Sequence, residues 1–320
     1  MKTVLVLGAA GRVGEAIAEA FVARGWRVKG AARRRHLSGL TAGVVPVELD
    51  ALDGEALARA AEGTEIVVNA LNPLYTEWEE KVMPMARNVA QAARRAGALH
   101  MLPGNVYNFG YGVREGMAED MPDLPSTAKA RIRIELEALF REEAARGGRT
   151  VVIRAGDFYG GRRPGTWLDE LILKKLRRDV ITWPGPADIP HAFAYLPDLA
   201  AAFVAVAERA QGLVPFETFH FEGHTLSGNE VKRLVEEATG RRLAMEGVPW
   251  RLLRLAGLFS PMLRELAAMS YLWRVPHSLD GTKLSRLAPE LAATPPDQAL
   301  VRAIRDLGLD GANAAERLAA

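Results

Sequence analysis

Apolar positions along the first hundred residues follow two alternating periods. Residues 2–7, 26–32, 44–50, 65–70 and 98–102 are short, mostly apolar runs of the length of buried strands. The intervening residues 15–24, 56–61 and 81–96 are rich in strong helix formers, with apolar positions at helical spacing. This alternation predicts a parallel sheet whose strands are joined by helices.

Three glycines separate the first strand from the first helix. Gly8 would allow a tight turn, Gly11 would let the backbone approach a ligand, and Gly14 would let helix and strand pack closely. The first helix would then point its positive end and its free N–H groups at that ligand. In this context the triplet predicts a dinucleotide site, with the diphosphate against the helix N-terminus.

Composition narrows the class of protein. The chain has 320 residues, 49% hydrophobic and 25% charged, and it has no cysteine. These values are typical of one large globular domain, or of one with a smaller lobe. The formal net charge of +2 gives no reason to expect a nucleic acid or a membrane as partner. We expect no metal site, because the six histidines lack metal-binding spacing, and we expect a cytoplasmic protein.

The end of the second strand bears on the choice of dinucleotide. An NAD enzyme usually has an acid there to bind the ribose 2′-hydroxyl, but this chain has Ala32 followed by Arg33, Arg34 and Arg35. Guanidinium groups suit the 2′-phosphate of NADP, and Arg12 in the glycine loop could add a contact. We therefore expect NADP rather than NAD; the alternative is a solvated basic turn.

The G-x-x-G-x-x-G spacing and the order of the later segments resemble the extended or atypical short-chain dehydrogenase/reductase superfamily, in its epimerase/dehydratase branch. The resemblance covers nearly the whole chain and implies an α/β fold, a Rossmann-type doubly wound parallel sheet with a smaller C-terminal substrate lobe. We predict an NAD(P)-binding Rossmann core over residues 1–160. Residues 161–320 would hold the remaining Rossmann elements, interleaved with the substrate-binding lobe.

The glycine loop, the basic turn and the resemblance together give a set of expected cofactor contacts at the ends of the strands. In the superfamily an acid after the third strand lies beside the adenine, and Asp50 is the candidate here, whereas Asp53 is expected to cap a helix. The expected cofactor-binding residues are Gly8, Ala10, Gly11, Arg12, Val13, Gly14, Arg33, Arg34, Asp50, Ala70, Leu71, Asn72, Lys129 and Gly156.

The chain departs from the superfamily at the positions of the catalytic residues. Members carry a Ser or Thr before a Val-Tyr-Gly-like turn, then Y-x-x-x-K on the next helix, in which the lysine lowers the tyrosine pKa and holds the nicotinamide ribose. Matching Val106-Tyr107 to that turn puts Pro103 at the serine position. Lys129 fits the lysine, but Pro125 stands four residues earlier, where the tyrosine belongs. Proline can neither donate nor accept a proton.

Three interpretations stay open. Catalysis could use Lys129 for the ribose, Asn105 to polarise a carbonyl, and Tyr107, Tyr159 or Tyr195 as the proton donor. The protein could instead bind NADP without turnover, as a sensor like the NmrA-type branch. The alignment could also be shifted, with the acid/base elsewhere. We favour an NADP-dependent oxidoreductase or epimerase/dehydratase acting on a small carbonyl or sugar-like molecule, with Lys129, Tyr107 and Asn105 as candidate catalytic residues.

The second half offers weaker signals. Six basic residues between 162 and 178 could attract a phosphorylated substrate, although a solvated helix face explains them as well. His191 is the histidine expected near the cleft, and Asp198 is expected to cap the helix that follows it. Residues 252–259 are hydrophobic nearly all round, so we expect them to be buried in the lobe or to form a subunit contact, which would make a homodimer.

Overall fold

A seven-stranded, all-parallel sheet forms the centre of the computed structural model, which describes residues 1–309. Its strand order is β10-β6-β5-β4-β1-β2-β3. The strands are β1 (Thr3–Leu7), β2 (Arg27–Ala32), β3 (Val44–Glu48), β4 (Ile66–Asn69), β5 (Leu99–Gly104), β6 (Thr150–Arg154) and β10 (Phe216–His220). The five strands expected in the first hundred residues are all present.

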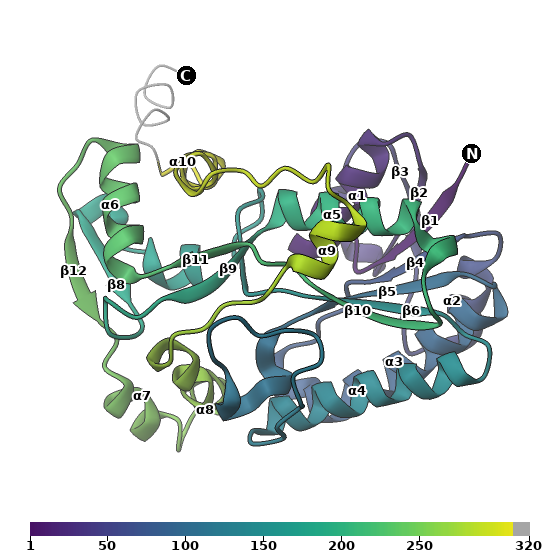
Figure 1. Ribbon diagram of the computed structural model, residues 1–320, viewed down its shortest axis with the longest axis horizontal. Helices are drawn as coiled ribbons and strands as arrows, with labels where there is room; N and C mark the ends of the chain where they lie inside the picture. The colour runs from purple at the N-terminus through teal and green to yellow at the C-terminus, as the bar shows by residue number, and fades with distance from the viewer. Residues whose placement is uncertain (310–320) are drawn as a thin grey trace.

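Helices cover both faces of this sheet (Figure 1). On one face α1 (Arg12–Ala23) packs against α5 (Leu196–Glu208); on the other α3 (Trp78–Arg95) lies between α2 (Gly54–Ala61) and α4 (Ala128–Ala145). Side chains of β1 alternate accordingly: Val4 and Val6 pack with the first group, Leu5 and Leu7 with the second. Because both faces of the sheet are buried, the sequence of β1 is a continuous apolar run. The parallel strands with helices on both faces confirm the predicted doubly wound sheet.

The smaller lobe lies at the left of Figure 1, beyond the end of the sheet. It contains a three-stranded sheet, β11-β9-β7, and a two-stranded sheet, β12-β8. Its strands are β7 (Asp157–Tyr159), β8 (Val180–Trp183), β9 (His191–Tyr195), β11 (His224–Leu226) and β12 (Ala244–Gly247). The later helices are α6 (Gly228–Thr239), α7 (Trp250–Ala256), α8 (Pro261–Ala268), α9 (Thr282–Leu287) and α10 (Pro296–Asp306).

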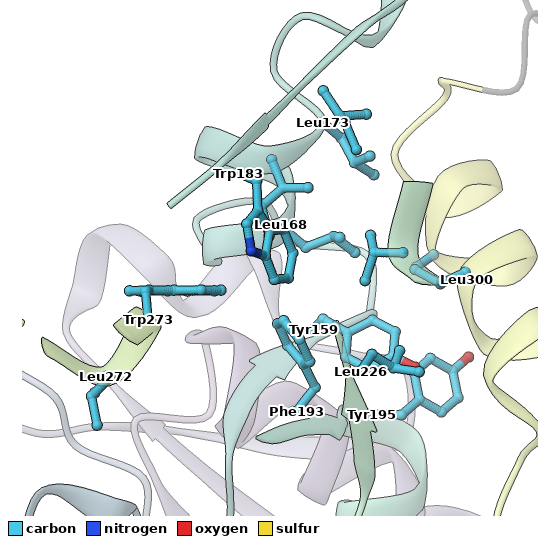
Figure 2. Close-up of a cluster of buried hydrophobic side chains, with 14 of the residues drawn as sticks. Tyr159, Leu168, Leu173, Trp183, Phe193, Tyr195, Leu226, Leu272, Trp273 and Leu300 are labelled. Atoms are coloured by element: carbon cyan, nitrogen blue, oxygen red, sulfur yellow. The ribbon is translucent and has the colours of Figure 1, made fainter. Parts of the chain in front are cut away.

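Aromatic and leucine side chains pack together in the core of the lobe (Figure 2). Trp183 and Trp273 meet edge to face with ring centroids 5.2 Å apart, and Phe193 and Tyr159 lie beside them. Shorter helical turns complete the described chain, at Arg34–Gly39, Tyr75–Glu77, Val106–Gly112, Leu168–Ile172, Leu176–Arg178, Ala210–Gly212 and Met269–Arg274.

Two expectations about caps have different outcomes. Asp53 accepts a hydrogen bond from the backbone N–H of Ala56 and caps α2, as expected. Asp198 does not cap α5, because that helix begins earlier, at Leu196. Asp198 instead accepts hydrogen bonds from the backbone N–H and the hydroxyl of Thr294, and so ties the C-terminal segment to α5.

The expectation that residues 252–259 are buried in the lobe is wrong for most of the segment. Leu252, Leu255, Leu258 and Phe259 are exposed. Trp250 anchors the start of α7, since its indole N–H donates to the carbonyl of Pro184 inside the core. Among the described residues, no helix combines the length and the apolar character needed to cross a membrane.

Candidate functional site

A cavity of about 1010 Å³ runs along the carboxyl ends of the parallel strands and into the lobe. The chain reverses its direction of crossing between β1 and β4, and such a switch point is where open α/β sheets bind ligands. The sheet-side wall follows the ends of successive strands: Gly8, Ala10, Gly11, Arg12 and Val13; Ala32, Arg33, Arg35 and His36; Asp50 and Ala51; Asn69, Ala70, Leu71 and Asn72; Pro103, Asn105 and Tyr107; Gly156 and Asp157.

Backbone geometry explains the three glycines. Gly8 has φ +74°, a left-handed conformation that favours glycine. A Cβ on Gly14 would lie 2.2 Å from the carbonyl oxygen of Gly8, so no side chain fits where α1 meets the loop. Gly14 itself does not line the cavity; it lets the loop and the helix approach each other. A Cβ on Gly11 would lie 3.2 Å from the same oxygen.

The N-terminus of α1 is open to a ligand. Gly11 is the N-cap, and within the described chain no side chain caps this end. The first residues of the helix, Arg12 and Val13, line the cavity together with Ala10. Their backbone N–H groups are therefore available to a ligand there, with the positive end of the helix dipole behind them. Bare amides and a loop of glycine and alanine fit the diphosphate of a dinucleotide.

The three arginines after β2 separate into two groups. Arg33 and Arg35 line the cavity. Arg34 does not: its Nε lies 3.0 Å from an oxygen of Glu48, and both side chains are exposed. Asp50 lines the cavity near the turn after β3, and its carboxylate accepts a hydrogen bond from the backbone N–H of Leu52.

Two tyrosines meet inside the cavity. The hydroxyls of Tyr75 and Tyr107 lie 3.1 Å apart, and both residues line the wall. Burial raises the pKa of Tyr75 and of Tyr107, in Tyr107 well above the ordinary value. The side-chain oxygen of Asn105 accepts from the backbone N–H of Tyr107, which holds the turn after β5 in place.

Two basic residues lie one turn apart on α4, and the cavity is lined by the second of them rather than by the one expected from the sequence. Lys129 is buried but does not line the cavity; it pairs with Glu265 of α8, and its Nζ lies 4.3 Å from the ring centroid of Tyr75. Arg133, one turn later, lines the cavity, and its guanidinium lies 4.9 Å from the ring centroid of Trp78. Its Nε is buried without a hydrogen-bond partner among the described residues.

An acid and a histidine adjoin the same region. Asp157 lines the cavity, and its carboxylate lies 2.8 Å from His191 Nε2. The His191 ring stacks on Trp273 with centroids 3.7 Å apart, so the histidine stands directly behind the cavity wall. His191 was expected near the cleft and lies there, whereas Arg133 and Asp157 were not among the expected site residues; the helical spacing Lys129–Arg133 was the available signal for the arginine.

Other candidates lie away from the cavity. The Tyr159 hydroxyl is 2.6 Å from His224 Nδ1 in the lobe core, and neither Tyr159 nor Tyr195 lines the wall. The six basic residues between 162 and 178 also lie outside it. Arg163 pairs with Glu15 at 3.0 Å, Arg162 pairs with Glu19, and Lys175 pairs with Glu246. Partners remote in sequence thus compensate three of these six charges.

Comparisons with known proteins agree with this geometry. Residues 8–128 match the family model described as NAD(P)H-binding. No curated protein matches the sequence. Among solved structures, the UDP-glucuronic acid 4-epimerase from Bacillus cereus in complex with NAD has a TM-score of 0.75 at 16% identity, covering 97% of this chain and 96% of that one.

Two further structures align over similar lengths. The UDP-glucose-4-epimerase from Stenotrophomonas maltophila, with bound NAD and formylated UDP-arabinopyranose, has a TM-score of 0.74 at 17% identity, covering 99% of this chain and 100% of that one. MoeE5 in complex with UDP-glucose and NAD has a TM-score of 0.74 at 19% identity, covering 96% and 98%. Residues 8–128 therefore match an NAD(P)H-binding family, and the chain as a whole has the Rossmann fold with a smaller lobe that these epimerase structures have.

Proposed function

We propose that this chain is an NADP-dependent oxidoreductase, or an epimerase or dehydratase that uses NADP transiently, acting on a small carbonyl or sugar-like substrate. The observation that carries the proposal is the continuity of one cavity: the same space borders the bare amides at the N-terminus of α1 and the hydroxyl of Tyr107. A bound dinucleotide and a small substrate could therefore meet there.

The preference for NADP rests on the end of β2. Arg33 lines the cavity at the place where the fold puts the adenosine ribose, and Ala32 replaces the acid that an NAD enzyme would carry. Arg33 and Arg35 would bind the 2′-phosphate, and Arg34 would contribute little because it pairs with Glu48. When bound, the reduced cofactor supplies a hydride.

The remaining cofactor contacts that we propose are made by other residues of the cavity wall. The glycine loop, with Ala10, Arg12 and Val13, would hold the diphosphate, and Asp50 would lie beside the adenosine. Residues 70–72 and Gly156 would border the nicotinamide half. A Cβ on Gly156 would lie 2.3 Å from the carbonyl oxygen of Ala192, so the absence of a side chain there also serves packing.

Tyr107 is the proposed proton donor. Its hydroxyl is protonated at neutral pH and can donate to a carbonyl oxygen as that oxygen gains charge, while burial, which raises its pKa, makes it a weaker acid than a solvent-exposed tyrosine. Tyr75 could return the proton through the 3.1 Å contact between the two hydroxyls. This protonation state favours carbonyl reduction over alcohol oxidation, which would need a tyrosinate. Asn105 is a positioning residue in this scheme.

Arg133 takes the place proposed from the sequence for Lys129, as the cation that faces the cavity. Burial lowers the pKa of Arg133 from its ordinary value, but that value is so high that the guanidinium stays charged at neutral pH. It would bind the nicotinamide ribose or the substrate oxygen. Lys129 would act indirectly, by holding α8 through Glu265 and by lying against the ring of Tyr75.

The end of the cavity that adjoins the lobe, where the substrate would bind, favours a small molecule over a nucleotide sugar. Trp167, Leu171 and Leu266 line it, together with the acids Asp157 and Glu170. MoeE5 and the epimerase from Stenotrophomonas maltophila hold sugar nucleotides, whose diphosphate these two carboxylates would repel. A small carbonyl compound with hydroxyl groups suits the same wall, because carboxylates accept hydrogen bonds from hydroxyls.

The test is oxidation of NADPH against a panel of aldehydes, ketones and nucleotide sugars. We expect turnover with a small carbonyl compound and a loss of about 10²–10⁴-fold in kcat for Tyr107→Phe. Tyr111→Phe is the matched control, since Tyr111 is 62% exposed and lies outside the cavity. Full activity of Tyr107→Phe would reject the proton-donor role.

A second function is favoured by a specific observation. Pro103 and Pro125 stand where the superfamily has its serine and tyrosine, and Glu265 engages the lysine that would complete the motif. A protein that binds NADP without turnover, as a redox-responsive sensor, would need none of these groups. Tight NADPH binding with no turnover on any member of the panel would support the sensor.

A further inference from the structure

Helices α7 and α8 form a hairpin that projects at the lower left of Figure 1, away from the large sheet. Its tip, residues 257–260, carries the two most exposed apolar side chains of the hairpin: Phe259 is 89% exposed and Leu258 is 72% exposed. Leu252 and Leu255, one helical turn apart on α7, are also exposed, as is Met262 at the start of α8. Five exposed apolar side chains gathered on one hairpin mark a place of contact.

Packing does not explain these side chains. The inner side of the hairpin is engaged elsewhere: Trp250 is buried in the lobe core, Leu253 packs against it, and Ala267 belongs to it. The exposed leucines and Phe259 lie on the outer side of the hairpin, which is not packed against the lobe core. Helices of a monomer normally place polar residues on that side.

The charged residues from 250 to 264 are all basic, and the one acid of the hairpin, Glu265, pairs with Lys129. Arg251, Arg254 and Arg264 are exposed, and residues 250–264 contain no acid. An apolar tip flanked by arginines is typical of elements that lie in a membrane interface, where the apolar groups enter the acyl boundary and the cations contact anionic headgroups. A second copy fits less well, because a two-fold contact would bring these arginines against their own symmetry mates.

The hairpin also borders the cavity. On α8, Glu265 pairs with Lys129, and the next residue, Leu266, lines the cavity wall. One helix thus closes the cavity on its inner side and belongs to the exposed apolar hairpin on its outer side. A surface that binds the tip would lie next to the substrate end.

We propose that the α7–α8 hairpin docks peripherally on an anionic lipid surface, with Leu258 and Phe259 entering the interface and Arg251, Arg254 and Arg264 contacting the headgroups. This docking depends on the local charge of the hairpin, and the whole-chain charge of +2 gave no sign of it. It does not depend on the proposed chemistry, because binding to lipid is measured without substrate or cofactor.

The experiment is cosedimentation of the full chain with vesicles of phosphatidylcholine and phosphatidylglycerol, and with vesicles of phosphatidylcholine alone. We expect binding to the mixed vesicles that weakens with salt and is poor on the neutral ones. The double variant Leu258→Ser, Phe259→Ser should bind at least about tenfold more weakly. Each arginine changed to Gln should cost about fivefold.

Val214→Ser is the matched control, because Val214 is 53% exposed outside the hairpin; it should bind as the parent does. Circular dichroism of each variant checks that the fold is kept. The proposal is overturned if the parent chain does not bind the mixed vesicles, or if the tip variant binds them equally well. It is also overturned if the parent is a dimer that the tip variant converts to a monomer while lipid binding is absent, since a second copy would then occupy the surface.

Discussion

Replacing Arg33 by alanine should lower the affinity for NADPH and leave that for NADH nearly unchanged. The guanidinium lines the cavity beside the end of β2, where the extra phosphate of NADPH would lie. A hydrogen bond to a charged group contributes about 1.5–3 kcal/mol. Because Arg33 is exposed, solvent and salt screen the interaction, so we expect the low end, about tenfold in Kd.

Arg34→Ala is the control that makes this prediction sharp. Arg34 is the next residue and has the same charge, but it pairs with Glu48 outside the cavity. Titration calorimetry of both variants with NADPH and NADH separates the contributions. Equal losses for the two cofactors in Arg33→Ala would refute the 2′-phosphate role. A loss in Arg34→Ala as large as in Arg33→Ala would show that net charge, rather than position, sets the preference.

Two further predictions concern stability. Glu137→Gln should lower the free energy of unfolding by about 3–5 kcal/mol, measured by urea denaturation, because it leaves the buried Arg154 without the carboxylate that now lies 2.6 Å away. The buried His100, whose pKa is lowered to about 3 because desolvation disfavours its charged form, stays neutral in the folded state, whereas the unfolded state binds a proton below about pH 6.5. Its contribution is therefore present above pH 6.5 and is lost as the pH falls, by up to about 1.4 kcal/mol per pH unit, and His100→Gln should remove that part of the slope.

Controls for these two changes come from exposed counterparts. Glu55→Gln breaks an exposed pair with Arg95 and should change stability by less than about 1 kcal/mol. His36→Gln makes the same substitution at an exposed histidine and serves as the control for the change of residue type. A small effect of Glu137→Gln would mean that water or Asp123, 3.5 Å from Arg154, compensates the charge. An unchanged pH slope in His100→Gln would mean that His100 titrates normally in the folded protein.

Local spacing carried most of the first half of the fold. The apolar runs, the helical periods and the glycine triplet between β1 and α1 depend on neighbours within a few residues, so their meaning survives without tertiary information. The turn at Gly8 and the cap at Asp53 were predicted for the same reason. Asp198 was misplaced as a cap because the start of α5 was predicted three residues too late.

The site needed contacts between distant segments. Whether Lys129 or Arg133 faces the cavity depends on the rotation of α4 against the sheet and on Glu265, 136 residues away, which holds the lysine. The separation of Arg34 from Arg33 likewise depends on Glu48, on a neighbouring strand.

By itself the sequence determined a doubly wound dinucleotide fold, because repeated local patterns suffice to place strands, helices and the glycine turn. Only the tertiary structure decided which charges face the cavity, which are neutralised by remote partners, and that the apolar side chains at the tip of the α7–α8 hairpin stay exposed. The physical reason is that a side chain's role depends on what is packed against it, and long-range packing is not written in the spacing of neighbouring residues.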